Sequence, residues 1–285
     1  MRTGYIKFAL VISVGIILTA CGLMRFEKRE PWRSKAEAVC LKRKLVTISQ
    51  DMKSAPAMNA GTCGMDYPFK IMAFANGSVR MKTQQTLACP IIPAIEAWIA
   101  EVVQPSADIY FGSKIVEMYT GSYSCRGRNN KRGAKLSEHS FGNAFDVLSF
   151  TLETGQVITV KKGWVGTETE RSFLREIFVG SCNYFTTVLG PGSDAYHNDH
   201  FHLDLARHDS QWSRRYCRPV LKFAPQIPYR SKQNNTYSTL YSAEPSKISA
   251  PVPDPEGISP PETTQSQEDS SEATPQEYRE NSDFQ

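Results

Sequence analysis

The sequence predicts an α+β fold, a single domain in which a small, mainly antiparallel sheet carries the functional site and helices flank it. Three observations support this: apolar residues recur at helical spacing, several short runs alternate as strands do, and no regular strand–helix alternation is present. Residues 36–222 are long enough for one domain with a buried core, and no internal repeat divides them.

Two segments have the periodicity of amphipathic helices. Residues 92–104 place apolar side chains along one stripe, and Pro93 suits a first helical turn. Residues 169–182 predict a second helix, with Phe173 and Ile177 directed inward. We expect both helices to pack on the sheet.

Shorter runs predict strands at about 114–123, 145–151, 156–161 and 200–205. Gly155 lies between the two middle runs and suits a tight turn, because glycine adopts left-handed backbone conformations at little cost. We therefore expect these two strands to form a hairpin.

The N-terminal residues 1–20 predict a lipoprotein signal peptide. Arg2 and Lys7 supply positive charge, and the apolar run 8–19 is too short for a secure transmembrane helix. The run ends in Leu-Thr-Ala-Cys, which resembles the bacterial lipobox, so Cys21 is the expected lipidation site. The alternatives are an ordinary secretory signal or an uncleaved anchor, with the cysteine incidental.

Lipidation would anchor the mature chain to a membrane, since two or three acyl chains bind stably where one does not. Residues 21–35 are then a tether. Gly22 follows the cysteine at a place where aspartate resembles an inner-membrane retention signal, so the outer membrane is favoured. The expected location is the periplasmic face of the bacterial envelope.

The cysteine count agrees with export. Of seven cysteines, one is assigned to lipid, and no Cys-x-x-Cys pair suggests a metal site. The remaining six predict up to three disulfides in an oxidising periplasm, with the pairing left open. These candidates are Cys40, Cys63, Cys89, Cys125, Cys182 and Cys217.

The C-terminal residues 223–285 predict a disordered acidic tail rich in Ser, Thr, Pro and Glu. Residues 251–285 hold nine acidic residues and one basic residue, a net charge of −8. Because the whole chain is +4, residues 1–250 carry +12. Export argues against nucleic acid as the partner, which leaves an anionic membrane or an acidic wall polymer such as peptidoglycan.

Histidines are concentrated in one part of the chain. The sequence has five, and four fall within residues 197–208, which begin His-Asn-Asp-His-Phe-His-Leu-Asp. A strand over 200–205 would place His200, His202 and Asp204 on one face, because side chains alternate along a strand. The apolar residues between them would face a core.

A second polar group lies upstream, where residues 137–146 are Ser-Glu-His-Ser-Phe-Gly-Asn-Ala-Phe-Asp. His139 and Asp146 can converge if the first ends a loop and the second starts a strand, and Gly142 supplies the backbone freedom. Two imidazoles and one carboxylate leave an open position on a zinc ion, which is typical of catalytic zinc sites. The sequence therefore predicts zinc as cofactor and zinc-dependent hydrolysis as activity.

These residues resemble the zinc peptidases of the lysostaphin, D-Ala-D-Ala carboxypeptidase and hedgehog group. The group's patterns are Ser-x-His-x-x-Gly-x-Ala-x-Asp, matched from residue 137 to 146, and His-x-His, matched at 200–202. The resemblance implies that His139, Asp146 and His202 hold zinc. It also implies that His200 is the catalytic histidine. A further histidine lines the site in the murein endopeptidases of this group, and here it is His197.

A closer resemblance covers approximately residues 38–218. The segments 122–126 (Ser-Tyr-Ser-Cys-Arg), 136–139 (Leu-Ser-Glu-His) and 187–194 (Thr-Val-Leu-Gly-Pro-Gly-Ser-Asp) resemble the bacterial extensin-like C-terminal domain family. The similarity to plant extensins in its name is loose and implies no plant function. The chemistry of this family is less settled than its membership, so the prediction of enzyme activity depends mainly on the ligand pattern.

One position departs from the carboxypeptidases, which place a general-base glutamate three residues before the last zinc histidine. Here that residue is Asp199, which is shorter and, on an extended strand, points away from the site. A base must reach the attacked water, so His200 is the preferred base or transition-state stabiliser and Asp199 the alternative. Arg126 matches an arginine that some relatives use for a substrate carboxylate or the oxyanion.

Ser137 and Asp204 are expected to contact either the substrate or the metal ligands. Asp204 would orient an imidazole by a hydrogen bond. Two functions remain. One is a zinc metallopeptidase or amidase, a hydrolase acting on the peptide stems of peptidoglycan. The other is a non-catalytic, zinc-containing envelope lipoprotein that binds peptidoglycan or a partner protein.

Overall fold

The computed structural model describes residues 28–228, all of which belong to one compact unit. The expected signal peptide, Cys21, and all but the first residues of the acidic tail lie outside the described residues. Within residues 28–228, no helix combines the length and apolar character needed to cross a membrane.

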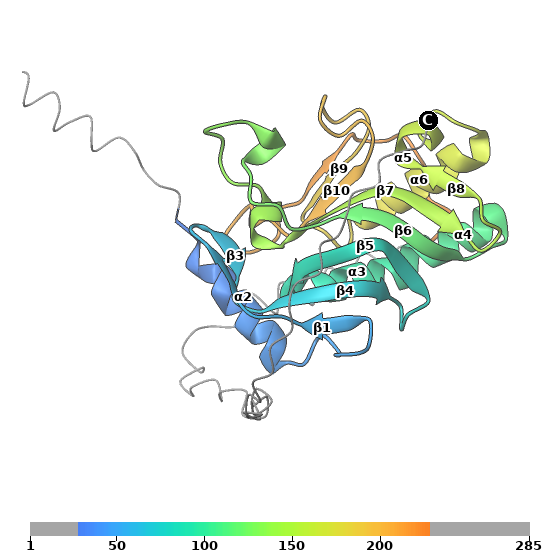
Figure 1. Ribbon diagram of the computed structural model, residues 1–285. Helices are drawn as coiled ribbons and strands as arrows, with labels where there is room; N and C mark the ends of the chain where they lie inside the picture. Colours follow the sequence, from blue (N-terminus) through green and yellow to red (C-terminus); the bar gives the residue numbers. More distant parts are fainter. Residues whose placement is uncertain (1–27, 229–285) are drawn as a thin grey trace, which may run out of the picture. The chain divides into compact units, whose positions relative to one another are not determined.

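Helices and strands follow each other along the chain without a regular order (Figure 1). The α-helices are α2 (Pro31–Lys42), α3 (Ile92–Trp98), α4 (Gln104–Phe111), α5 (Val160–Gly163) and α6 (Glu168–Ser181). Three 3-10 turns, η1 (Cys89–Ile91), η3 (Arg128–Asn130) and η4 (Glu138–Phe141), and one π-helical turn, η2 (Ile99–Val103), complete the helical elements of the described chain.

The strands are β1 (Met52–Ser54), β2 (Met58–Ala60), β3 (Cys63–Met65), β4 (Pro68–Phe74), β5 (Val79–Ala88), β6 (Ile115–Gly121), β7 (Ala144–Leu152), β8 (Val157–Thr159), β9 (Thr187–Leu189), β10 (Phe201–Asp204) and β11 (Tyr216–Arg218). Nine of them form one sheet in the order β1-β4-β5-β6-β7-β10-β9-β11, with β8 also paired to β7. Strands β2 and β3 form a separate pair.

The α+β class is confirmed, but the prediction of a small sheet is wrong. The sheet is large and mixed, because β5 pairs with β6 and β9 with β11 in parallel while the other pairs are antiparallel. Strands β1, β4 and β5 extend it on one side, and none of them was predicted. Strand β5 begins with buried Val79 and Met81 alternating with exposed Arg80 and Lys82. Polar residues then fill its centre, which weakens its apolar pattern.

The predicted helix at 92–104 is confirmed and continues further. It runs from α3 through the π-helical turn η2 into α4, ending at Phe111 before the left-handed Gly112. Pro105 lies just after η2 and cannot donate a backbone hydrogen bond. A π-helical turn changes the bonding pattern locally, and we infer that it accommodates the proline without ending the helix.

The other predicted elements are also present. Helix α6 begins with a capping box between Thr167 and Glu170 and covers the predicted 169–182 segment. Strands β7 and β8 form the expected antiparallel hairpin, with Gly155 in the turn at φ +85°. Phe173 and Ile177 are fully buried, as predicted.

Helices α3, α4 and α6 cover one face of the sheet (Figure 1). Trp98 lies at the centre of this layer, with its ring centroid 6.4 Å from that of Phe150 on β7 and 6.0 Å from that of Phe185. Phe173 of α6 packs edge-on against Phe150 at 5.5 Å. These contacts fix the core side of β7, and with it the direction of the residues on the opposite face.

All six disulfide candidates are paired, which confirms the prediction of three bonds. The pairs are Cys40–Cys89, Cys63–Cys125 and Cys182–Cys217.

The folded region extends beyond the predicted limits of 36 and 222 at both ends. Helix α2 already begins at Pro31, inside the predicted tether. At the other end, the backbone N–H groups of Gln226 and Ile227 donate to the carboxylate of Glu176, at 2.8 and 3.0 Å. Glu176 is fully buried in α6, so these residues are part of the packed structure.

Candidate metal centre

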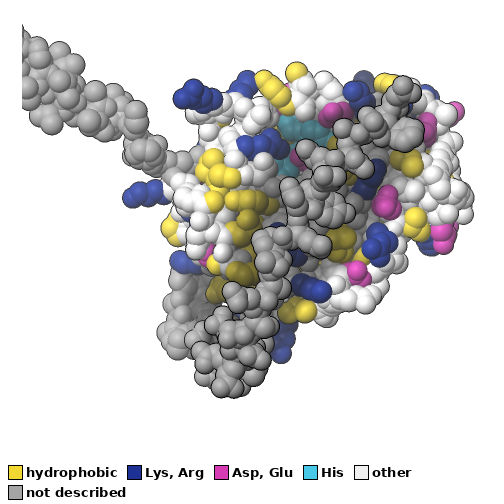
Figure 2. All heavy atoms as spheres, viewed as in Figure 1, with side chains coloured by type: hydrophobic (Ala, Val, Ile, Leu, Met, Phe, Trp, Pro, Cys, Tyr) yellow, Lys and Arg dark blue, Asp and Glu magenta, His cyan; other side chains and the backbone are white. Residues whose placement is uncertain are grey.

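Three of the predicted ligands lie together at the surface of the sheet opposite the helices. His139, Asp146 and His202 each offer a ligand atom, and these atoms lie within 4.8 Å of one another. His139 Nε2 is 3.0 Å from Asp146 Oδ2, and His202 Nδ1 is 2.9 Å from Asp146 Oδ1. Figure 2 shows histidine side chains reaching the surface, with Lys and Arg side chains around them.

Two of these ligands are neighbours on adjacent strands. Asp146 of β7 pairs directly with His202 of β10 in the antiparallel register. Phe145 and Val147 flank Asp146 and are fully buried. Phe201 and Leu203 flank His202 and are also fully buried. The core therefore holds the alternate side chains and leaves this cross-strand pair on the other face, where opposed side chains approach closely.

The third ligand comes from the turn η4. Ser137 caps this turn by accepting a hydrogen bond from the His139 backbone N–H, and Gly142 ends it at φ +59°. A Cβ on Gly142 would lie 2.9 Å from the backbone nitrogen of Ala88, so a larger residue fits neither the conformation nor the space. The predicted need for glycine here is confirmed.

The ring nitrogens that face away from the group are also occupied. His139 Nδ1 lies 2.5 Å from the Ser122 carbonyl oxygen, so it donates a hydrogen bond there. His202 Nε2 lies 2.9 Å from Asp204 Oδ2. Such partners fix the orientation of metal-binding imidazoles, and they direct His139 Nε2 and His202 Nδ1 toward Asp146, where both could bind an ion.

A buried ionic network, the Arg33–Glu138–Asn143 network, joins the two segments that supply the histidines. Arg33 of α2 donates to both carboxylate oxygens of Glu138 at 2.7 Å, and Asn143 Nδ2 donates to the same carboxylate at 2.7 Å. Asn143 Nδ2 also donates to the carbonyl of Leu205, at the end of β10. Glu138 adjoins His139, so this network positions the turn relative to the strand.

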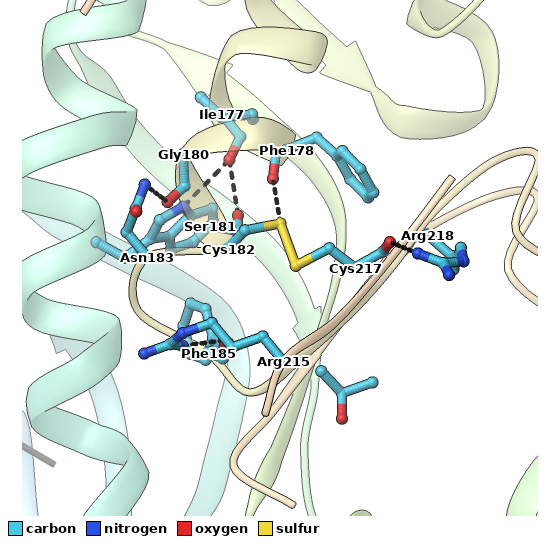
Figure 3. The surroundings of a disulfide bond; sticks show 12 residues. Ile177, Phe178, Gly180, Ser181, Cys182, Asn183, Phe185, Arg215, Cys217 and Arg218 are labelled. Atoms are coloured by element: carbon cyan, nitrogen blue, oxygen red, sulfur yellow. Dashed lines mark hydrogen bonds between the residues drawn. A yellow bond between two sulfur atoms is a disulfide. The ribbon is translucent and has the colours of Figure 1, made fainter. Parts of the chain in front are cut away.

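The strand that carries His202 is supported on its outer side. Strand β9 pairs with β10, and β11 pairs with β9. The Cys182–Cys217 disulfide joins the end of α6 to β11, and Arg215 donates to the carbonyl of Phe185 at 2.6 Å (Figure 3). The edge of the sheet near the site is thereby covalently tied to the helical layer.

His200 lies beside the three ligands, where it was predicted. Its Nε2 is 3.7 Å from Asp146 Oδ1, and its Nδ1 is 2.8 Å from Asp199 Oδ1. Asp199 is half exposed and contacts His200 instead of the three-ligand group. The aspartate therefore orients the histidine, and His200 is the better placed of the two to act as a base.

His197 lines the same site. Its ring centroid is 5.2 Å from that of His200 and 5.5 Å from that of His202, and its Nδ1 bonds to Asp194 at 2.8 Å. Asp194, the last residue of the 187–194 segment, accepts the backbone N–H of Tyr196 and also orients this site histidine. Its spacing of three residues before His197 is the only sequence signal for this role.

Arg126 also points toward the group, with Nη2 3.7 Å from Asp146 Oδ2. His208, the last of the five histidines, lies past the strand, and its Nε2 is 2.9 Å from the hydroxyl oxygen of Thr187. Two contributors were missed: the Ser122 carbonyl, which leaves no side-chain signal, and Arg33, which is 105 residues from its partner.

The comparison with protein families identifies the family of this chain. Residues 38–218 match the family model described as extensin-like protein C-terminus. The chain belongs to this extensin-like family. The chain matches no curated protein and no solved structure. The conclusions about the site of this extensin-like domain therefore depend on its own residues.

Zinc fits the donor set of the extensin-like domain. Two imidazoles and one carboxylate converge, and the distal nitrogens of both imidazoles are hydrogen-bonded, a donor set and support typical of zinc sites. Three ligand atoms would be supplied by His139 Nε2, Asp146 and His202 Nδ1.

The charges of the metal-free site stabilise each other. Burial disfavours the imidazolium of His202, but hydrogen bonds from its ring to Asp146 and Asp204 outweigh burial and raise its pKa to about 10. Burial likewise favours neutral Asp146, yet the imidazoles of His139 and His202 hold its pKa well below the usual value. A proton on His202 thus takes the place that a metal cation would fill.

The raised pKa of His202 predicts that the stability of the metal-free protein, measured with a chelator present, depends on pH. Because the folded pKa of His202 is raised, its contribution is fully present below its unfolded pKa of 6.5 and is lost as pH rises toward 10. We expect the thermal midpoint of the metal-free protein to fall by about 5–10 °C across this range, from a few pKa units on a buried group. The thermal midpoint of the zinc-loaded protein should fall less over the same pH range, since zinc replaces the proton. An equal fall of the midpoint with and without zinc would contradict this.

Proposed function

We propose that this protein is a zinc-dependent peptidase or amidase that acts on the peptide stems of peptidoglycan in the cell envelope. The observation that carries the proposal is the placement of His200. Its Nδ1 is engaged by Asp199, and its Nε2 faces the group formed by His139, Asp146 and His202. A purely structural metal site would not need an oriented, partly exposed base beside it.

The residues divide the chemistry among them. When bound, zinc would lower the pKa of a water molecule and polarise the scissile carbonyl. His200 Nε2 accepts the proton of the attacking water and passes it to the leaving amine. Asp199 accepts the Nδ1–H of His200, which keeps the required tautomer and stabilises the protonated ring. Arg126 holds the developing oxyanion or a substrate carboxylate.

The envelope location follows from the sequence. The N-terminal segment predicts export and lipidation at Cys21, the outer membrane being favoured, and the three disulfides suit an oxidising compartment. Peptidoglycan is the proposed substrate because it is the abundant peptide polymer there and because the zinc peptidases that the motifs resemble cleave it. Without residues 1–20, which carry Arg2 and Lys7, residues 21–250 have a net charge of +10, and this charge suits an anionic polymer.

Purified protein incubated with isolated muropeptides tests the proposal. We expect release of a stem fragment, detected by mass spectrometry, that stops on addition of chelator and resumes with zinc. His200→Ala should lower the rate at least 100-fold while retaining zinc, since an acid–base group contributes about 10²–10⁴.

His208→Ala is the matched control, because this histidine is near in sequence but contacts Thr187 outside the metal group. It should retain both zinc and activity. Intact muropeptides with zinc-loaded protein would overturn the proposed hydrolysis and favour a non-catalytic protein that binds the wall.

A further inference from the structure

Next to the metal centre the chain forms a loop of unusual charge, the basic loop, which comprises residues 126–136. Figure 1 shows it in green, projecting from the body of the domain near β9 and β10. It contains five cationic residues and no acidic residue: Arg126, Arg128, Lys131, Arg132 and Lys135.

The base of the basic loop is tied to the turn that carries His139. The Arg126 N–H donates to Ser140 Oγ, and the Ser137 N–H donates to the Arg126 carbonyl, at 3.0 Å in each case. The preceding residue, Cys125, is held by its disulfide to Cys63. The base of the basic loop therefore has a defined position relative to the three candidate metal ligands.

The loop is also ordered internally and contacts the opposite side of the site. Gly127 and Leu136 form a β-bridge, and the Arg128 N–H donates to the Lys135 carbonyl at 2.8 Å. Toward its tip, Lys131 Nζ lies 5.2 Å from the ring centroid of Tyr196, which directly precedes His197. The loop thus reaches from Arg126 at the metal group to the segment that bears the site histidines.

The cations of the basic loop are largely uncompensated. Arg126 is 3.7 Å from Asp146, but Arg128, Lys131, Arg132 and Lys135 form no ion pair with any carboxylate within residues 28–228. The nearby acids Asp194 and Asp199 are already engaged by His197 and His200. Like charges held close repel one another, and an anionic ligand would relieve that repulsion.

We propose that the basic loop is the substrate-binding part of the site and that it selects peptides with at least two free carboxylates. Arg126 binds the carboxylate nearest the scissile bond, and the outer cations, Arg128 and Lys131 foremost, bind a second one. This inference rests on the proposed function, since it names the class of peptide that the site takes.

Binding can be measured apart from cleavage in zinc-loaded His200→Ala protein. The probes are a dye-labelled pentapeptide with a free C-terminal carboxylate and a free glutamate carboxylate, and the same peptide with both groups amidated. We expect the free acid to bind about tenfold more tightly at low salt, with the difference shrinking as salt rises.

Replacing Arg128→Gln and Lys131→Gln together should weaken binding of the free acid about fivefold and leave the amidated peptide unchanged, as expected for two exposed ion pairs. The matched control is Lys161→Gln with Lys162→Gln, an exposed basic pair on α5. It should leave both affinities within about twofold.

Equal affinity for the two peptides, or an equal effect of the two double variants, would overturn the role of the basic loop. Cleavage by the native protein without carboxylate preference would likewise overturn it while supporting the peptidase. Carboxylate-selective binding without cleavage by native protein would support the basic loop and overturn the peptidase.

Discussion

Replacing His202 by Ala is expected to remove bound zinc from this protein. The residue offers one of the three ligand atoms that could hold the ion, and its ring is held by Asp204 so that Nδ1 faces Asp146 and His139. Zinc-site free energies of about 10–16 kcal/mol, divided among three ligands, correspond to a loss of roughly 10²–10⁴-fold in affinity. Competition with a chromogenic chelator measures this affinity, and hydrolysis should disappear in parallel.

Asp204→Asn provides a graded comparison. The carboxylate accepts a hydrogen bond from His202 but is not one of the three candidate ligands, so we expect an intermediate loss of about 10–100-fold in zinc affinity. His208→Ala should bind zinc like the native protein. If His202→Ala retained native affinity, the assignment of the three ligands would be wrong.

The second large effect concerns Arg33, which lies far from the metal in sequence. Changing Arg33→Met leaves the buried carboxylate of Glu138 without its bidentate partner. Breaking a buried ion pair from one side costs about 3–5 kcal/mol of unfolding free energy. Urea denaturation should show this loss, and zinc affinity should also fall because Glu138 adjoins His139.

The double variant Arg33→Met with Glu138→Gln separates ion pairing from packing. Without the carboxylate no charge is left unpaired, so we expect at least half of the lost stability to return. Arg33→Lys should be intermediate, since a single ammonium cannot make two parallel bonds to a carboxylate. Equal stability of the native protein and Arg33→Met would exclude the proposed role of this network.

Much of the metal centre could be predicted from the sequence, because its signals are local. The alternation of residues 200–205 correctly separates Phe201 and Leu203 on the core side from His202 on the other. Strand pairing then supplies what alternation cannot, since Asp146 faces His202 only through the β7–β10 register. The motif resemblance had predicted that Asp146 and His202 lie close together.

The unpredicted parts depend on contacts between distant segments. Strand β1 has only three residues and the centre of β5 is polar, so neither gives a strong apolar alternation. Strand β4 does alternate buried and partly buried residues, and this signal was missed, so the sheet was expected to be small. The bond between Arg33 and Glu138 spans 105 residues, and neither residue stands out by composition. The support of His139 by Ser122 uses a backbone carbonyl, a group that every residue carries.

The contact between Glu176 and the residues after the last strand determines where this domain can be cut. Its carboxylate accepts the backbone N–H groups of Gln226 and Ile227 inside the protein. A recombinant fragment ending at residue 222 would lack both donors, so the buried carboxylate of Glu176 would lose two of its hydrogen bonds while keeping the one from the Tyr110 hydroxyl. A fragment used for crystallisation or binding measurements should therefore retain Gln226 and Ile227.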